Sequence, residues 1–146
     1  MTRVTNRITI DRPIAAVFGV ITDVEQTGRW FPGDVEEHWT SPEPRGVGST
    51  RHAVVTVLGR RTENDAVVTA YDPPRHAVME GTTPNAPIVV SLDLAPAGDA
   101  TRVTVTSEFR LRGIARIAGP LAAAAYGLAW RRGLATLKRK MEAGRL

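Results

Sequence analysis

The sequence contains no cysteine, few aromatic residues and no long hydrophobic run. Because none of its 146 residues is cysteine, disulfide bonds, thiolate catalysis and the common cysteine-ligated zinc sites are excluded. No apolar segment approaches the roughly 20 residues that a membrane-spanning helix needs. The first residues, Met1 to Asn6, lack the apolar core of a secretory signal. We therefore expect a cytoplasmic protein without a transmembrane segment.

The remaining composition is that of an ordinary globular protein. Hydrophobic residues make up 42% of the chain and charged residues 23%, which excludes a disordered or fibrous polypeptide. The length predicts a single domain over residues 1–146. A fold of this size buries roughly two thirds of its extended-chain surface, enough for a core and an internal pocket.

The charge is unevenly distributed along the chain. Residues 1–109 carry 10 basic and 14 acidic side chains, whereas residues 110–146 carry 9 basic side chains and one acidic side chain, Glu142. A basic C-terminal segment is typical either of a partner with negative charge, such as nucleic acid or a membrane surface, or of a solvated helix face. We favour the solvated face because no aromatic residues interleave with the terminal cluster to stack on bases. No nucleic-acid partner is therefore expected.

The N-terminal segment predicts one strand and two short helices. Residues 4–10 alternate with Ile8 and Ile10 on one face, as in a strand. Asp11 is a candidate capping side chain and Pro13 suits a first helical turn, so an amphipathic helix is expected over 13–23. Residues 23–31 predict another turn or two, which Pro32 and Gly33 end.

The pattern then changes to strands. Six candidates are separated by short segments rich in glycine and proline, so neighbouring strands should pair as antiparallel hairpins; they are 35–41, 50–58, 62–71, 75–82, 87–95 and 101–111. The last candidate has one covered and one solvated face. Its covered face comprises Val103, Val105, Ser107, Phe109 and Leu111.

A long C-terminal helix is expected over residues 120–142, with Gly119 and Pro120 marking either a kink or its start. Its expected apolar stripe comprises Ile114, Ile117, Leu121, Ala125, Leu128, Leu134, Leu137 and Met141. This helix is the only element able to cover the sheet. Its glycines, Gly119, Gly127 and Gly133, keep it thin, which either leaves a cavity or permits close packing.

Several of these segments resemble one superfamily. They are Ile10–Pro13 with Val17–Phe18, Thr22–Asp23, Arg29–Trp30, Tyr71–Arg75 and the ending Leu137–Glu142. In this order, over nearly the whole chain, they are similar to the SRPBCC or START-like (Bet v 1-like) helix-grip superfamily, most closely its polyketide cyclase/dehydrase and lipid-transport group. The resemblance implies an α+β fold in which a seven-stranded antiparallel curved sheet surrounds a long C-terminal helix, with two short helices after the first strand. It also implies a deep pocket for an apolar ligand.

The family does not imply one activity, because its members include lipid carriers, aromatic polyketide cyclases, hormone receptors, chaperone regulators and oxygenase domains. The few aromatic residues and one methionine are the candidate ligand-binding residues: Trp30, Phe31, Trp39, Met79, Phe109, Tyr126 and Trp130. Tyr126 and Trp130 share a helix face, and strand alternation turns either His38 or Trp39 inward. Ordinary packing is an equal explanation for Trp30 and Phe31.

No motif identifies catalytic residues or a metal site. The three histidines, His38, His52 and His76, lack paired ligand spacing, so no metal and no cofactor are expected. No serine lies in a nucleophile-elbow pattern. The glycine turn at 46–50 is no phosphate-binding loop, and we expect it to shape the mouth of a pocket at most.

These observations leave three functional hypotheses. The first is a binder of a small hydrophobic molecule, such as a lipid, a fatty acid or a polyketide-like aromatic, in a cavity between sheet and helix; the protein would be a monomer or homodimer. The second is a polyketide cyclase or dehydratase that uses acid–base catalysis there. It would need two or more titratable groups facing inward, and the sequence offers few. The third is an interaction protein that uses the basic C-terminal helix.

Overall fold

The computed structural model describes residues 2–57, 59–83, 88–109 and 115–146. Their elements follow the order β1 (Thr2–Ile10), α1 (Ile14–Ile21), the 3-10 helix η1 (Val24–Arg29), β2 (Asp34–Trp39), β3 (Thr50–Val57), β4 (Arg60–Asp72), β5 (His76–Gly81), β6 (Ile88–Ala97), β7 (Ala100–Phe109) and α2 (Ala115–Glu142). Within these residues, no helix combines the length and hydropathy that a membrane span requires.

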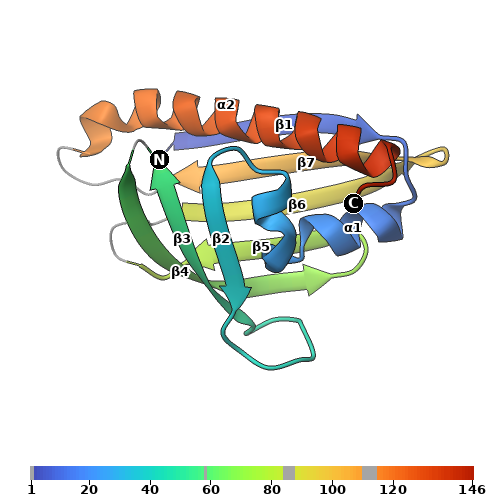
Figure 1. Cartoon of the computed structure of the whole chain (residues 1–146), viewed down its shortest axis with the longest axis horizontal. Helices are drawn as coiled ribbons and strands as arrows, with labels where there is room; N and C mark the ends of the chain where they lie inside the picture. The colour runs from blue at the N-terminus through green and yellow to red at the C-terminus, as the bar shows by residue number, and fades with distance from the viewer. Residues whose placement is uncertain (1, 58, 84–87, 110–114) are drawn as a thin grey trace.

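The strands form one seven-stranded sheet in the order β1-β7-β6-β5-β4-β3-β2, and every neighbouring pair is antiparallel. Figure 1 shows the sheet curling until β2 and β3 lie in front of its centre, while α2 runs along β1. A register shift in β4 between Val68 and Ala70 accompanies this curl. The expected fold class and all the expected strands are confirmed; expected end positions 58, 87, 110 and 111 lie outside the described residues.

The start of α1 differs from the expectation. Its N-cap is Pro13, whose carbonyl oxygen accepts hydrogen bonds from the backbone of Ala16 and Val17, and no described side chain caps the helix. The Asp11 backbone N–H instead donates to Glu142 at the end of α2, over 2.8 Å. The segment before α1 is therefore held by the C-terminal helix and not by its own cap. The second short helix, η1, follows the side-chain cap of Asp23.

Helix α2 begins at Ala115, before the expected start at 120, so Pro120 lies inside the helix. A proline removes one backbone hydrogen bond. Pro120 is the sixth residue of α2, just beyond the first turn, so the single bond to the carbonyl oxygen of residue 116 is lost near the start of a 28-residue helix. The longer helix is therefore compatible with this proline.

The buried face of α2 also differs from the expected stripe. Leu134, Leu137 and Met141 are buried as expected. By contrast, Leu121 is 79% exposed and Leu128 is 47% exposed, and Ala125 is exposed too. Ile114 and the side chain of Ile117 lie outside the described part of the chain. The buried face of the first half of α2 is instead formed by small and aromatic residues: Ala123, Gly127 and Trp130.

The glycines of α2 permit close packing. A Cβ atom at Gly127 would lie 2.7 Å from Cγ1 of Val4 in β1. At Gly133 it would lie 3.2 Å from the Phe31 ring. The contact at Gly127 is too short for an added Cβ and the one at Gly133 is tight, so of the two explanations offered for the glycines, close packing applies at these positions. Gly119 lies among the residues whose side-chain surroundings are not described.

Candidate functional site

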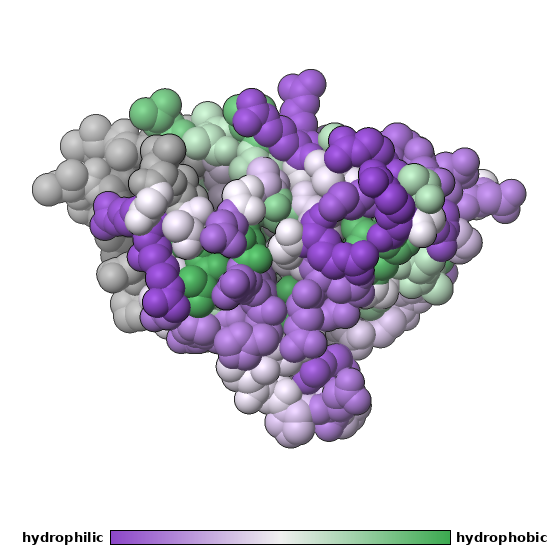
Figure 2. All heavy atoms as spheres, viewed as in Figure 1, coloured by the Kyte–Doolittle hydropathy of each residue, from purple (hydrophilic) through white to green (hydrophobic). Residues whose placement is uncertain are grey.

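Among the described residues, the inner face of the half-barrel is more completely buried near the C-terminal end of α2 than toward its first half. Near the C-terminal end of α2, the inward-facing side chains are almost completely buried: Ile10, Thr101, Val103, Leu137 and Met141. Toward the first half of α2, residues of the same inner face are only half-buried: Met79, Val90, Leu92 and Phe109. Within the described part of the chain, this region of the inner face is therefore less completely buried than the region near the C-terminal end of α2. Figure 2 shows hydrophobic residues between hydrophilic ones on the face viewed.

Five of the seven candidate residues come together in what we call the aromatic row: Trp30, Phe31, Trp130, Tyr126 and Phe109. Ring centroids lie 5.2 Å apart for Phe31 and Trp130, 6.4 Å for Tyr126 and Trp130, and 5.1 Å for Phe109 and Tyr126. These distances suit edge-to-face aromatic contacts. The row therefore connects the end of η1, the buried face of α2 and the open end of β7.

The other two candidates lie elsewhere. Met79 is half-buried on the inner face of β5, opposite Val68 and Val90 in the register. Trp39 faces inward, and the alternation therefore turns His38 outward. Trp39 lines a cavity of about 270 Å³ that we call the end cavity, whose walls are Phe18, Gly19, Thr22, Asp23, Glu25, Trp39, Glu43, Arg45, Gly46, Val68 and Tyr71.

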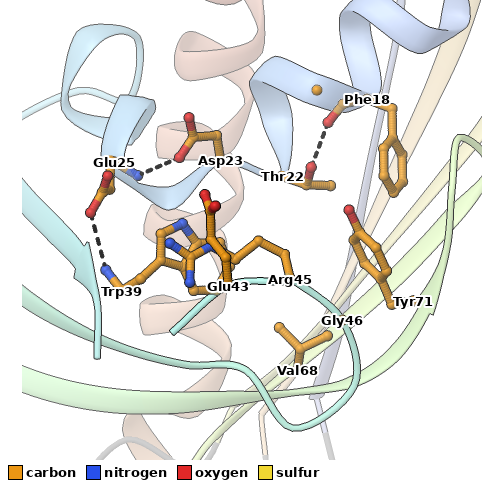
Figure 3. Close-up of a pocket in the computed structure, with 11 residues that line it drawn as sticks. Phe18, Thr22, Asp23, Glu25, Trp39, Glu43, Arg45, Gly46, Val68 and Tyr71 are labelled. Atoms are coloured by element: carbon orange, nitrogen blue, oxygen red, sulfur yellow. Dashed lines mark hydrogen bonds between the residues drawn. The ribbon is translucent and has the colours of Figure 1, made fainter. Parts of the chain in front are cut away.

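The end cavity has one aromatic wall and one charged wall. In Figure 3, Phe18 and Tyr71 stand on one side, and their ring centroids are 5.6 Å apart. The other side gathers Trp39, Glu43 and Arg45, and the Arg45 guanidinium lies 4.6 Å from the Trp39 ring centroid. Its described lining includes no residue of α2, so this hollow is not the cavity expected between sheet and helix. Gly46 of the glycine turn is among its lining residues, but the pocket whose mouth that turn was expected to shape is the one between sheet and helix.

The inner face of β2, β3 and β4 carries a polar cluster, the polar triad of Glu37, Arg51 and Asn64. Oε2 of Glu37 lies 3.3 Å from Nε of Arg51, and the two side chains are only 14% and 13% exposed. Nη1 of Arg51 donates to the backbone and side-chain oxygens of Asn64. The alternation of β2 places Glu37 on the same face as Val35 and Trp39.

Burial raises the pKa of Glu37, although the nearby Arg51 guanidinium and the Thr27 hydroxyl both act to lower it. Burial also raises the pKa of Tyr126, with smaller opposing effects from the Trp130 indole and Arg51 and a raising effect from Glu37. The polar triad and the aromatic row are therefore close enough to interact electrostatically. The interior holds two acids whose neutral forms are favoured by desolvation.

Several buried donors in this region lack acceptors. Among the described residues, no acceptor completes a hydrogen bond with Nε of Arg51 or with the indole nitrogens of Trp30 and Trp130. The Trp130 N–H lies near enough to the Tyr126 oxygen to affect its pKa, yet it completes no hydrogen bond of ordinary geometry. An unpaired buried donor costs about 1–3 kcal/mol. An oxygen atom from outside the chain would relieve that cost.

A model of one protein family matches residues 1–142, nearly the whole chain; its description is polyketide cyclase / dehydrase and lipid transport. The chain belongs to this family. The helix-grip fold agrees with the match, which confirms the resemblance drawn from the sequence. No curated protein sequence matches this family member.

Solved structures share the fold at low sequence identity. A crystal structure of TTHA0849 from Thermus thermophilus aligns with a TM-score of 0.81 at 16% identity, covering 99% of this chain and 100% of that one. A solution structure of the Aha1 dimer from Colwellia psychrerythraea aligns at 0.70 and 19% identity, with 100% of both chains covered. CalU16 from Micromonospora echinospora gives 0.63 at 20% identity, covering 92% of this chain and 73% of that one. These likenesses concern the fold alone.

The polar triad was not identified from the sequence, although the alternation of side chains along the strand contains information about it. Once Trp39 is assigned inward, Glu37 must share its face, because side chains of a strand alternate. The pairing of β2 with β3 then places Arg51 opposite Trp39. The expectation that few titratable groups face inward was therefore wrong for this part of the sheet.

The histidines lie apart from the triad. His38 and His52 pair across β2 and β3 with ring centroids 5.6 Å apart. Nδ1 of His52 lies 2.7 Å from Asp65, and Nδ1 of His76 lies 2.8 Å from Asp93. Within the described ranges, no group of three or more histidine and acidic side chains has a geometry that could hold a metal ion.

Part of the basic C-terminal charge serves the fold. The Lys138 ammonium donates to the Thr9 carbonyl oxygen in β1, over 2.7 Å, and to Glu142, over 2.6 Å. Lys140 donates to the Arg29 carbonyl oxygen at the end of η1. Both lysines therefore bind α2 to neighbouring elements. These contacts do not require an anionic partner.

Proposed function

We propose that this protein binds one small hydrophobic molecule, of the lipid, fatty-acid or polyketide-like aromatic class, against the inner face of the sheet beneath the first half of α2. The supporting observation is the contrast between the two ends of the interior. Apolar residues of the inner face, Met79, Val90 and Phe109, remain half-buried at one end, whereas Ile10, Val103, Leu137 and Met141 near the C-terminal end of α2 are almost completely buried. A ligand would bury the half-buried residues further.

The aromatic row and the polar triad give this surface the composition of a ligand site. Burial of apolar area supplies about 25 cal/mol per Å². A small number of polar groups then fixes the ligand's orientation. Here Phe109 and Tyr126 would contribute apolar contact, and the neighbouring Glu37 and Arg51 would contribute polarity.

Titration with Nile red, an uncharged fluorophore whose emission increases in apolar surroundings, tests the proposal. We expect saturable binding with a stoichiometry of one dye per chain. Native mass spectrometry of the protein purified from its own host should in addition detect a retained small molecule. If Nile red fails to bind the folded protein saturably, the proposal is wrong.

A second candidate function is an acid–base enzyme of the cyclase or dehydratase class. It is favoured by one observation, the pair of inward acids Glu37 and Tyr126, because burial raises both pKa values. A carboxylate whose pKa is raised toward neutrality is a better proton acceptor. A test is the conversion of a poly-β-ketone substrate: Glu37→Gln should abolish turnover while Nile red binding is retained. If turnover survives in this variant, Glu37 is not the base.

A further inference from the structure

We propose that the polar triad is a specificity subsite that selects an uncharged polar group, one with a hydrogen-bond acceptor beside a donor, over a carboxylate. A carboxamide or a hydroxy ketone has this arrangement. The inference rests on the proposed binding of a hydrophobic molecule and narrows its chemistry. It assigns the polar end of that molecule to Glu37 and Arg51.

The hydrogen-bond inventory of the triad leaves room for such a group. Asn64 accepts twice from Nη1 of Arg51, whereas Nε lies 3.3 Å from Oε2 of Glu37 but completes no hydrogen bond with any described residue. Both carboxylate oxygens of Glu37 accept hydrogen bonds when the side chain is ionised. Arg51 and Thr27 are the polar side chains that lower its pKa. A ligand acceptor would therefore satisfy Arg51, and an adjacent ligand donor would satisfy Glu37.

The charges of the triad favour a neutral group. The Arg51 guanidinium and the Glu37 carboxylate oppose each other at 3.3 Å, and Asn64 carries no charge. The positive charge of Arg51 is thus already compensated within the chain. A ligand carboxylate placed here would lie beside Glu37 in a poorly solvated site, where like charges repel more strongly than in water. An uncharged group avoids that repulsion.

The triad adjoins both candidate ligand surfaces, although none of its three residues is among those that line the end cavity. Arg51 pairs in register with Trp39, which lines the end cavity. On the other side, Glu37 and Arg51 act electrostatically on Tyr126 of the aromatic row. The two side chains keep 14% and 13% of their surface exposed.

Dodecanoate and dodecanamide test the selection, because they have the same shape and differ in charge. Each competes with bound Nile red at neutral pH against the unmodified protein, Glu37→Gln and the control Glu36→Gln. Glu36 is the adjacent residue of β2, is exposed and faces outward. We expect the unmodified protein and the control to bind dodecanamide roughly tenfold more tightly than dodecanoate. Glu37→Gln should lose or invert this preference, since the charge of Arg51 is then uncompensated.

A second variant keeps the test decisive if Glu37→Gln is poorly folded. Arg51→Gln removes the positive charge and leaves Glu37, so its preference for dodecanamide should increase. Equal affinities in the unmodified protein, or a ratio that neither variant shifts, overturn the selection while the proposed hydrophobic binding stands. The same conclusion follows if Nile red binds and neither competitor displaces it. Failure of Nile red itself to bind rejects the proposed function and this inference with it.

Discussion

Glu37 and Arg51 lie diagonally across β2 and β3, with 3.3 Å between Oε2 and Nε, and burial outweighs their attraction. The pKa of Glu37 is raised although a guanidinium lies beside it. When desolvation exceeds the Coulombic gain, a buried ion pair does not increase stability over an apolar pair. The pair is therefore better explained by its position in the candidate ligand site than by a contribution to the fold.

The raised pKa of Glu37 predicts a pH dependence of folding. Between its ordinary value of 4.5 and the higher folded value, the folded protein binds more protons than the unfolded chain. The free energy of unfolding should thus decrease as the pH rises through this window. Urea titrations at several pH values give the free energy of unfolding as a function of pH. This free energy should fall less steeply with rising pH for Glu37→Gln than for the unmodified protein, even if the variant is less stable at every pH. Parallel curves would contradict the assignment.

Phe109→Ala is expected to weaken Nile red binding more than it weakens the fold. Phe109 is half-buried and contacts Tyr126 at the open end, so its removal should cost less stability than the about 3–5 kcal/mol typical of a buried phenylalanine. The control is Leu137→Ala at the packed end, where the side chain is 0% exposed. That change should cost about 2–5 kcal/mol and leave dye affinity unchanged.

Measurements on both variants below their melting temperatures separate the two effects. If Leu137→Ala lowers the dye affinity as much as Phe109→Ala does, the dye reports general loosening of the core. The ligand surface would then not lie at the open end. Circular dichroism melts supply the stability values for the comparison.

The sequence predicts those structural features that depend on residues close together in the chain, and it does not predict those that depend on contacts between distant elements. Strand alternation and turn residues are local, and they predict the sheet and that either His38 or Trp39 faces inward; the structure shows that it is Trp39. The buried face of α2 is set by contact with β1 at Gly127, so a stripe that includes Leu121 was wrong. Likewise, η1 approaches β2 so closely that a Cβ at Gly28 would overlap the Val35 carbonyl oxygen. No local pattern indicates that approach.

The contact between Glu142 and two partners predicts an acid-sensitive connection between α2 and the N-terminal segment. Hydrogen bonds from the Lys138 side chain and the Asp11 backbone N–H lower the pKa of Glu142. The stabilisation is therefore present above the unfolded pKa and is lost as the pH falls through the lower folded pKa. Glu142→Gln should melt below the unmodified protein at neutral pH, and the two melting curves should converge in acid. A difference that persists at low pH would assign the effect to packing.

Gly127→Ala is expected to separate α2 from β1. The added Cβ would lie 2.7 Å from Cγ1 of Val4, a β-branched side chain that cannot easily rotate away. The displacement would also strain the hydrogen bond from Asn6 to the Gly127 carbonyl oxygen, which is 3.1 Å long. Overpacking of this kind costs about 1–3 kcal/mol.

Further variants make the Gly127 prediction specific. Gly19→Ala in α1 meets nothing within 4 Å and should instead stabilise the protein by about 0.5–1 kcal/mol, because alanine loses less backbone entropy in a helix. Adding Val4→Ala to Gly127→Ala removes the clashing methyl groups, so the double variant should recover stability relative to Gly127→Ala alone. Urea unfolding of the unmodified protein, the two single variants and the double variant measures this coupling. Additive effects of the two changes would mean that Val4 and Gly127 do not define the spacing between α2 and β1.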